Sequence, residues 1–330
     1  MFQPSVILHP TDFSEAAHAA FAHAVDLARR HEADLHLLHV STDFGDDPIR
    51  DAYEAKVNTE GFNRAIRAAA VSDMKKMLAT VEADDVSITT TYERGVAAAP
   101  IILEYATVHS VDLIVMGTHG RRRVRRFVMG SVTEEVMRYA SCSVLTVRHE
   151  ADAGPRAVER VLVPLDLSET SERLLSTAEA VAASFDASLD VLHVVEPLPF
   201  TVPLLGGVTL RDVLPDPEES TMNQLISMAE RIGSGDVAIQ PHVAEGDADH
   251  TILETADALG ADLIVIASHN ASRIQRALLG SVTARVLRRA DCPVLVVRFP
   301  SEAASDPASD PASDPASDAA PNAADGPETT

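Results

Sequence analysis

The sequence predicts an α/β fold of two tandem domains, each with a five-stranded parallel sheet covered by helices on both faces. One reason is a repeat: residues 130–148, GSVTEEVMRYASCSVLTVR, return as residues 280–298, GSVTARVLRRADCPVLVVR, with 12 of 19 positions identical. The other is that short apolar runs alternate with helical patterns, which is typical of parallel strands joined by crossover helices. A period near 150 residues is too long for a solenoid and indicates a duplicated domain.

The first repeat shows the alternation most clearly. Strands are expected at Val6–Leu8, Leu35–Val40, Val86–Tyr92, Leu113–Met116 and Val144–Val147. Between them we expect a first helix after an N-cap at Ser14, with an apolar face that contains Phe21. Further helices are expected around residues 60–82, at Pro100–His109 and at Ser131–Tyr139.

The repeat also sets the predicted domain boundaries. HPTDFSE at 9–15 matches VPLDLSE at 163–169 with an offset of 154, whereas the later segments are offset by 150. The second copy has therefore lost four residues in its middle. We expect a first domain at 1–149, a linker at 150–157, a second domain at 158–300 and a tail at 301–330. The tail repeats PASD and has seven acidic residues and no Lys or Arg, a composition that favours disorder.

Composition excludes some functions. The 330 residues include 50 acidic and 27 basic ones, and a net charge of −23 opposes binding to nucleic acid or to an anionic membrane as the main activity. Only three of the basic residues are lysines, which favours a halophilic cytoplasm, the alternative being an acidic surface kept for solubility.

Two cysteines, no signal-peptide pattern and no long apolar run predict a cytoplasmic protein. Cys142 and Cys292 are equivalent in the two copies, which favours packing over redox chemistry.

A glycine motif follows a predicted buried strand and leads into a helix. Residues 117–131 read GTHGRRRVRRFVMGS, or G-x2-G-x9-G-S, which is neither a Walker A loop nor GxGxxG. Ligands bind beyond the carboxyl ends of strands in open parallel sheets. Glycines let backbone amides approach a phosphate, and a helix N-terminus adds N–H donors and a partial positive charge. The motif therefore predicts a phosphate site.

These residues resemble the ATP-binding branch of the universal stress protein family, whose signature is G-2x-G-9x-G-(S/T). The resemblance covers residues 1–148 and 157–298 and implies two Rossmann-like (adenine nucleotide alpha hydrolase-like) domains. It also implies that Asp12 contacts the nucleoside, that Val40 contacts the base, and that the phosphates are held by Gly117, Gly120, Gly130 and Ser131. The candidate site further includes the neighbouring residues Pro10, Thr11, Met116, His119, Arg121 and Val132.

The second repeat departs from the signature. Ala267 and Asn270 replace Gly117 and Gly120, so the second domain is expected to be a pseudo-site, and the two glycines are interpreted as serving the ligand rather than the fold.

Several candidate residues have alternative roles. Ser131 with Glu134 forms a capping box in the alternative interpretation, and Asp12 caps the first helix. The arginines of 121–126 either contact phosphate or lie in a solvated loop. His9, His39 and His119 are weighed as a metal site and favoured as structural.

Three functions remain open. The favoured one is an ATP-binding protein of stress response or regulation, with or without Mg²⁺, that holds nucleotide in the first domain and lacks a set of catalytic residues. The alternatives are a slow ATPase or phosphotransferase and a nucleotide-independent interaction scaffold. The resemblance also implies that Val144–Val147 pairs with Val294–Val297 inside the chain, and it leaves open a homodimer and an unknown protein partner.

Overall fold

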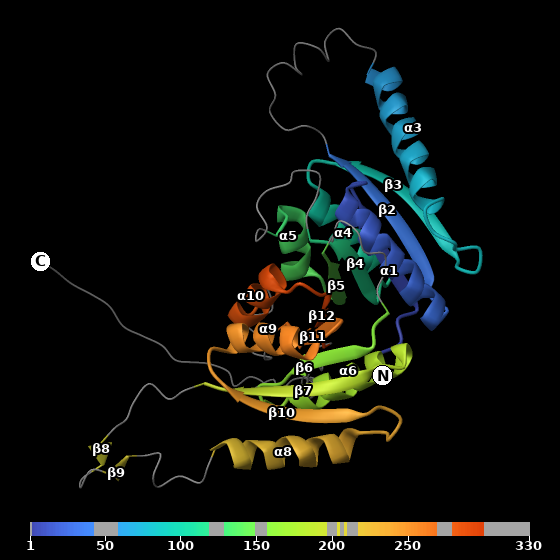
Figure 1. Ribbon diagram of the computed structural model, residues 1–330. Coiled ribbons are helices and arrows are strands. Elements are labelled where there is room, and N and C mark those ends of the chain that lie inside the picture. The colour runs from blue at the N-terminus through green and yellow to red at the C-terminus, as the bar shows by residue number, and fades with distance from the viewer. Residues whose placement is uncertain are drawn as a thin grey trace, which may run out of the picture. The chain divides into compact units, whose positions relative to one another are not determined.

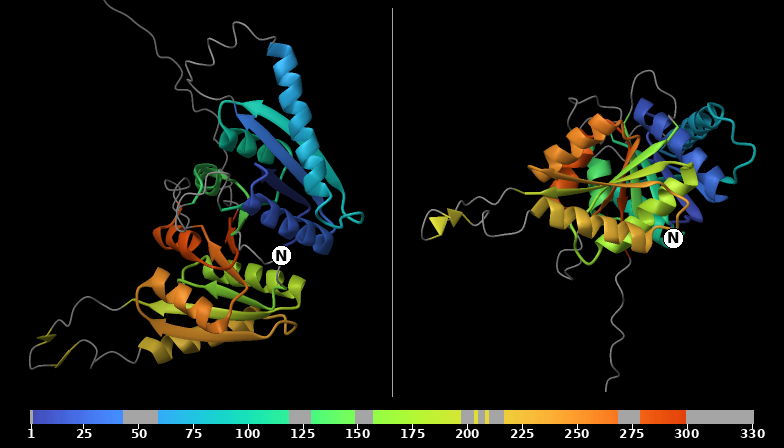
Figure 2. Two further views of the ribbon diagram at one scale, coloured as in Figure 1. Left: turned by 45° about the horizontal axis from the view of Figure 1, so that its top comes forward. Right: turned by 60° about the horizontal axis from the view of Figure 1, so that its bottom comes forward.

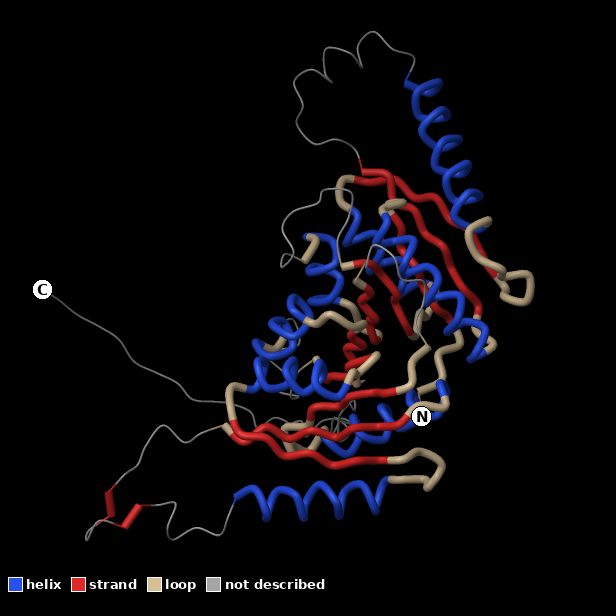
Figure 3. The backbone as a smooth tube through the Cα atoms, in the orientation of Figure 1, coloured by secondary structure: helices blue, strands red, loops and turns tan. Residues whose placement is uncertain are grey.

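The computed structural model describes residues 2–42, 59–118, 129–148, 157–196, 203–204, 208–209, 217–268 and 279–299. In these ranges, ten strands form one sheet in the order β10-β7-β6-β11-β12-β5-β4-β1-β2-β3 (Figures 1 and 3). β8 (Pro203–Leu204) and β9 (Val208–Thr209) form a separate pair. The tail at 301–330, most of the linker and the segment 119–128, which holds His119, Gly120 and the arginines of 121–126, lie outside the described residues.

The first repeat has the expected alternation of strands and helices. In chain order its elements are β1 (Val6–Thr11), α1 (Glu15–His31), β2 (Asp34–Thr42), α3 (Thr59–Leu78), β3 (Ile88–Gly95), α4 (Ala98–Val108), β4 (Leu113–Gly117), α5 (Ser131–Tyr139) and β5 (Ser143–Val147). Its strands are parallel to their neighbours within the repeat. The predicted elements are confirmed, and the differences lie at their ends.

The second repeat has the same strand order. Its elements are β6 (Arg160–Pro164), α6 (Ser171–Phe185), β7 (Ser188–Val195), α8 (Pro217–Ile232), β10 (Ile239–Glu245), α9 (Ala248–Leu259), β11 (Leu263–Ala267), α10 (Ser281–Arg289) and β12 (Val294–Val297). The strands of this repeat are also parallel to one another.

The two repeats join through their last strands. β12 pairs antiparallel with β5, and Leu295 lies opposite Leu145 at the centre of the register. This pairing confirms the expected contact between Val144–Val147 and Val294–Val297. It also removes two sheet edges, because each strand supplies the backbone partners that the other needs.

Helices cover both faces of the sheet (Figures 1 and 2). On one face, side chains such as Ile7 pack with α1, α3, α6 and α8 in one apolar cluster. On the other, side chains such as Leu8 pack with α4, α5, α9 and α10 in a second cluster. Successive strand residues point to opposite faces, so continuous apolar runs such as those of β1 and β4 are buried on both sides. Among the helices described, none combines the length and the apolar character that crossing a membrane requires.

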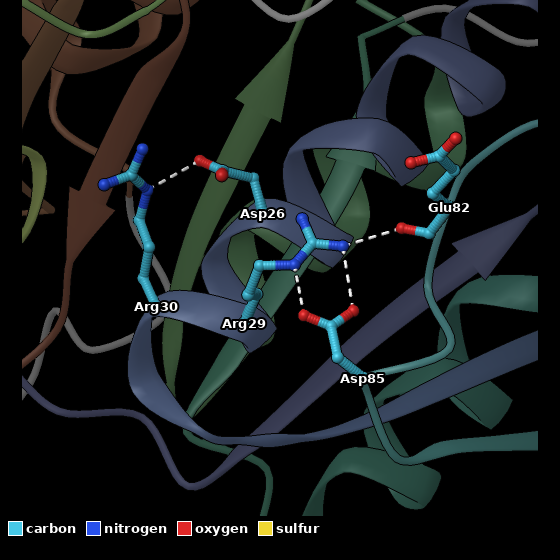
Figure 4. A network of polar contacts seen from close by, with 5 residues as sticks. All are labelled: Asp26, Arg29, Arg30, Glu82 and Asp85. Atoms are coloured by element: carbon cyan, nitrogen blue, oxygen red, sulfur yellow. Dashed lines mark hydrogen bonds and ion pairs between the residues drawn. The ribbon is translucent and has the colours of Figure 1, made fainter.

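Helix α1 shows how the sequence sets local structure. Ser14 is its N-cap, as predicted, and its hydroxyl accepts a hydrogen bond from the Ala17 amide at 3.2 Å. Near the other end, Arg29 binds both carboxylate oxygens of Asp85, at 2.6 and 3.0 Å, and donates to the Glu82 carbonyl at 2.6 Å (Figure 4). This bidentate contact ties α1 to the chain that leads into β3.

The two cysteines lie at helix-to-strand junctions and are half-buried. Burial raises the pKa of Cys142 to about 11 and that of Cys292 to about 12. Because the thiolate is the reactive form, both side chains are poor nucleophiles at neutral pH. Their environment supports the packing role inferred from the sequence.

Candidate functional site

The candidate site lies at the carboxyl ends of β1, β2 and β4. β1 lies between β4 and β2, so the strand order reverses beside it. The backbone pairing of β1 with β4 ends at Leu8 and Ile114, three residues before either strand ends. In parallel α/β sheets, strands that separate at such a reversal form the usual ligand crevice.

Asp12 begins the turn that links β1 to α1. Its carboxylate oxygen Oδ1 accepts a hydrogen bond from the Ser14 amide at 3.0 Å, while Phe13 has a positive φ of 61°. The second repeat builds the same turn, with Ser168 donating to Asp166 at 3.0 Å and Leu167 at a φ of 58°. The alternative that Asp12 is the helix cap is wrong, since Ser14 caps the helix and Asp12 shapes the turn before it.

His39 holds the end of β2 against the end of β1. Its Nδ1 atom lies 2.8 Å from the Thr11 carbonyl oxygen, and its ring stacks on Phe13 with centroids 4.5 Å apart. His193 makes the same 2.8 Å contact with Leu165 in the second repeat. The repeated contact gives His39 a structural role at the end of β2, and Val40 is the next residue of that strand.

His9 is fully buried between β1 and β4. Its Nδ1 donates to the Val115 carbonyl at 2.8 Å, just beyond the point where the backbone pairing of the two strands ends. Burial lowers the pKa of His9 to about 4, so the ring is neutral at physiological pH. Its Nε2 has no hydrogen-bond partner in the described part of the chain.

Hydrogen bonds hold both ends of the glycine motif, residues 117–131, next to the sheet. The Thr118 amide donates to the Val147 carbonyl at 3.0 Å, and the Gly130 amide donates to the Thr118 carbonyl at 2.8 Å. The Thr133 hydroxyl then donates to the Gly117 carbonyl at 2.9 Å. The second repeat repeats all three contacts, with Thr283 donating to Ala267 at 3.0 Å. Thr133 is a positioning residue that our sequence reasoning missed, although its presence in both copies was a usable signal.

Helix α5 points its N-terminus at this edge of the sheet. Gly130 is the N-cap and makes no side-chain capping hydrogen bond, and Ser131 is the first helical residue. The alternative of a capping box formed by Ser131 and Glu134 is not observed: Gly130 takes the N-cap position, and the Glu134 carboxylate lies 3.6 Å from Arg138 and 3.4 Å from Arg288. A glycine cap offers no side-chain acceptor, so the first-turn amides are suited to receive an anion.

Gly117 has a packing role that the sequence did not reveal. A Cβ on Gly117 would lie 2.8 Å from both the carbonyl carbon and the oxygen of Ala16, in the first turn of α1. In the second repeat, where Ala267 carries a Cβ, α6 begins at Ser171, the counterpart of Ala17, two residues later than α1 begins. The inference that Gly117 serves the ligand rather than the fold is corrected accordingly.

The described candidate residues lie at or near the carboxyl ends of β1, β2 and β4 and at the start of α5. Nine of the twelve are described, and the other three, His119, Gly120 and Arg121, lie outside the described residues. The second-repeat counterparts of all nine line a single pocket of about 460 Å³: Pro164, Leu165, Asp166, Val194, Ile266, Ala267, Gly280, Ser281 and Val282. The sequence motif and the strand topology therefore indicate the same edge of the sheet as the location of the candidate site.

A sheet in which the strand order reverses, with helices on both faces, defines an α/β protein of the doubly wound class. The profile of the Universal stress protein family matches residues 5–148 and again residues 157–298, so the chain belongs to the universal stress protein family.

Individual relatives match one repeat or both. A universal stress protein of Methanocaldococcus jannaschii is 33% identical over 151 residues, covering 45% of this chain and 87% of that protein. A universal stress protein of Mycolicibacterium smegmatis is 28% identical over 306 residues, covering 88% and 96%. The crystal structure of a universal stress protein from Archaeoglobus fulgidus covers 90% of this chain and 99% of its own, with a TM-score of 0.65 and 21% identity. That structure shows that the fold is shared over both repeats.

Proposed function

We propose that the first domain of this universal stress protein binds ATP and that binding serves stress response or regulation rather than rapid catalysis. The observation that carries the proposal is the convergence of the motif residues at the carboxyl ends of β1, β2 and β4. Their counterparts in the second repeat enclose a pocket, and this supports a ligand site at the same place in the first. The domain boundaries proposed from the sequence place this site within residues 1–149.

The local chemistry at both ends of the site suits one nucleotide, with its phosphates at one end and its nucleoside at the other. Ser131 lies at the exposed N-terminal turn of α5, where backbone amides and a partial positive charge favour phosphate oxygens. Asp12 and Val40 lie at the ends of the two neighbouring strands, where the resemblance assigns the nucleoside. Magnesium would arrive with the triphosphate, and the oxygens of Asp12 and Ser131 are of the hard type that it prefers.

We propose binding without rapid turnover on the basis of the described side chains near the phosphate position. Phosphoryl-transfer enzymes use a lysine or arginine, a metal-binding carboxylate and a residue that orients the nucleophile. Among the described candidate residues, Asp12 is the only charged side chain, so none of them supplies the lysine or arginine. We therefore propose at most slow ATP hydrolysis.

Acid extraction of the purified protein, followed by identification of the released nucleotide, tests this function. Recovered ATP, together with an ATP-dependent rise in melting temperature, supports the proposal. ADP with sustained release of phosphate would favour the slow ATPase instead. A nucleotide-free protein whose melting temperature is unchanged by ATP would favour the interaction scaffold.

A further inference from the structure

Three rings of the first repeat lie in a row across the ends of neighbouring strands. Phe13, in the turn after β1, stacks on His39 of β2 with ring centroids 4.5 Å apart. The His39 ring lies 6.2 Å from the ring of Tyr92, its register partner on β3. Arg67 of α3 lies over the Tyr92 ring, with its guanidinium carbon 5.9 Å from the ring centre. We call Phe13, His39 and Tyr92 the ring cluster.

The ring cluster lies on the opposite face of the sheet from Val40. Successive residues of a strand point to opposite faces, so the side chains of His39 and Val40 diverge. Phe13 and Tyr92 pack against the apolar cluster under α1 and α3, whereas Val40 packs against the cluster under α4 and α5. The rings therefore support the end of β2 from the face that Val40 does not use.

The ring cluster also holds the turn that carries Asp12. Phe13 follows Asp12 and has a φ of 61°, a left-handed conformation that costs energy in a residue with a side chain. Nδ1 of His39 donates to the Thr11 carbonyl at 2.8 Å, and the Phe13 amide donates to the Thr11 hydroxyl at 3.0 Å. The residues on both sides of Asp12 are thus held in place by the same group of contacts.

The second repeat keeps the histidine and replaces its neighbours with aliphatic residues. The counterparts of Thr11, Phe13 and Tyr92 are Leu165, Leu167 and Val243. The second repeat nevertheless has the same strand order and the same turn, with Leu167 at a φ of 58°. The fold therefore forms without aromatic rings at these positions. The rings occur in the repeat whose glycine motif is complete.

We propose that Phe13, His39 and Tyr92 are positioning residues for the nucleoside end of the first-repeat site. They act through the backbone: the rings hold the turn at Asp12 and the end of β2 at Val40 in fixed relative positions. Groups that are held in place before binding lose less conformational freedom when the ligand arrives, which raises affinity. The proposal rests on the proposed function, in which Asp12 and Val40 contact the nucleoside of ATP.

Calorimetric titration of ATP into full-length variants tests the ring cluster. Tyr92→Val introduces the second-repeat residue and should weaken ATP binding about three- to tenfold, the range that the loss of one aromatic pair corresponds to. Tyr92→Phe keeps the ring and should bind ATP as the parent chain does. Phe13→Leu, also the second-repeat residue, should weaken binding by a similar factor. The double variant should lose less than the product of the two factors, because both rings act through His39.

Tyr105→Leu is the matched control, because it removes a ring of the same repeat on the other face of the sheet. The Tyr105 ring lies 5.8 Å from that of His36 and 4.1 Å from that of His109, and its hydroxyl lies 3.0 Å from Nδ1 of His36. This variant should lose stability in urea denaturation and keep the ATP affinity of the parent. A ring cluster that only stabilised the fold would give the same result for Tyr92→Val.

The proposal is overturned if Tyr92→Val and Phe13→Leu bind ATP as tightly as the parent chain. It is also overturned if Tyr105→Leu or Tyr92→Phe loses as much affinity as Tyr92→Val. ATP binding by the parent with no difference among the variants leaves the proposed function standing and rejects the ring cluster alone. A parent chain that binds no ATP rejects the proposed function, and the role of the ring cluster with it.

Discussion

Arg148 and Arg298 are equivalent in the two repeats, and each caps the last helix of the other repeat. Arg148 follows β5 and donates to the carbonyl of Arg288 in α10 at 2.6 Å. Arg298 follows β12 and donates to the carbonyls of Met137 and Arg138 in α5, the latter at 3.2 Å. A cation at a helix C-terminus satisfies free carbonyl groups and opposes the helix dipole. The two arginines thus link the repeats by hydrogen bonds in addition to the β5–β12 pairing.

Replacing Arg298 should destabilise the joined repeats. Arg298→Met keeps much of the aliphatic stem but leaves the Met137 and Arg138 carbonyls without their donor, at a cost of about 1–3 kcal/mol in the free energy of unfolding. Urea denaturation followed by circular dichroism measures the change. Lys76→Met, at an exposed helical pair with Asp73, is the control and should cost under about 0.5 kcal/mol. Equal stability of the two variants would show that the exchanged arginines do not hold the repeats together.

His9 should make the stability of the protein depend on pH. Its pKa is about 4 in the folded state against an ordinary value of 6.5, so the unfolded chain binds the proton first as pH falls. Stability is therefore highest above pH 6.5 and is lost as pH falls toward 4, by about 3 kcal/mol from this group.

The variant His9→Val separates this contribution from those of the other histidines, because Val163 is the natural counterpart in the second repeat. The unfolding free energy of His9→Val should fall less steeply between pH 6.5 and pH 4 than that of the parent. It should also be about 1 kcal/mol lower at pH 7, since the hydrogen bond to Val115 is lost. Parallel pH profiles for the two proteins would contradict the burial of a neutral His9.

Adding one methyl group at Gly117 should disturb the first repeat. The new Cβ would lie 2.8 Å from backbone atoms of Ala16, so that β4 or α1 must shift, at a cost of about 1–3 kcal/mol. The reciprocal change Ala267→Gly removes a methyl group where α6 starts later, and it should cost under about 1 kcal/mol. Chemical denaturation of the matched pair checks this asymmetry. A Gly117→Ala protein as stable as the parent would mean that the close contact with Ala16 is not a constraint.

The sequence predicted much of the fold because the alternation of elements is local and the duplication is explicit. Ser14 was identified as a cap because its hydroxyl acts on an amide only three residues away. The alternative cap at Ser131 could not be decided from the sequence because Gly130 and Ser131 are both suited to an N-cap, and only the backbone shows that Gly130 takes that position.

Other features depend on contacts between distant parts of the chain. The role of Gly117 depends on Ala16, about a hundred residues away, and so could not be read from its motif. The similar segments DFSE and DLSE lead into helices that begin at different positions, Glu15 and Ser171. The pocket of the second repeat was missed because two substitutions in the signature were interpreted as a loss, whereas Asp166, Gly280 and Ser281 still line a cavity.

Calorimetric titration of ATP into Asp12→Ala and Asp166→Ala, compared with the unmodified chain, tests most directly whether the first domain holds the nucleotide. Asp12 and Asp166 shape the same turn in the two repeats, so that the variants are matched in their effect on the fold. We expect one ATP per chain, about tenfold or more weaker binding in Asp12→Ala, and unchanged binding in Asp166→Ala. Loss of ATP binding in Asp166→Ala with full binding in Asp12→Ala would place the nucleotide in the second domain and contradict the account.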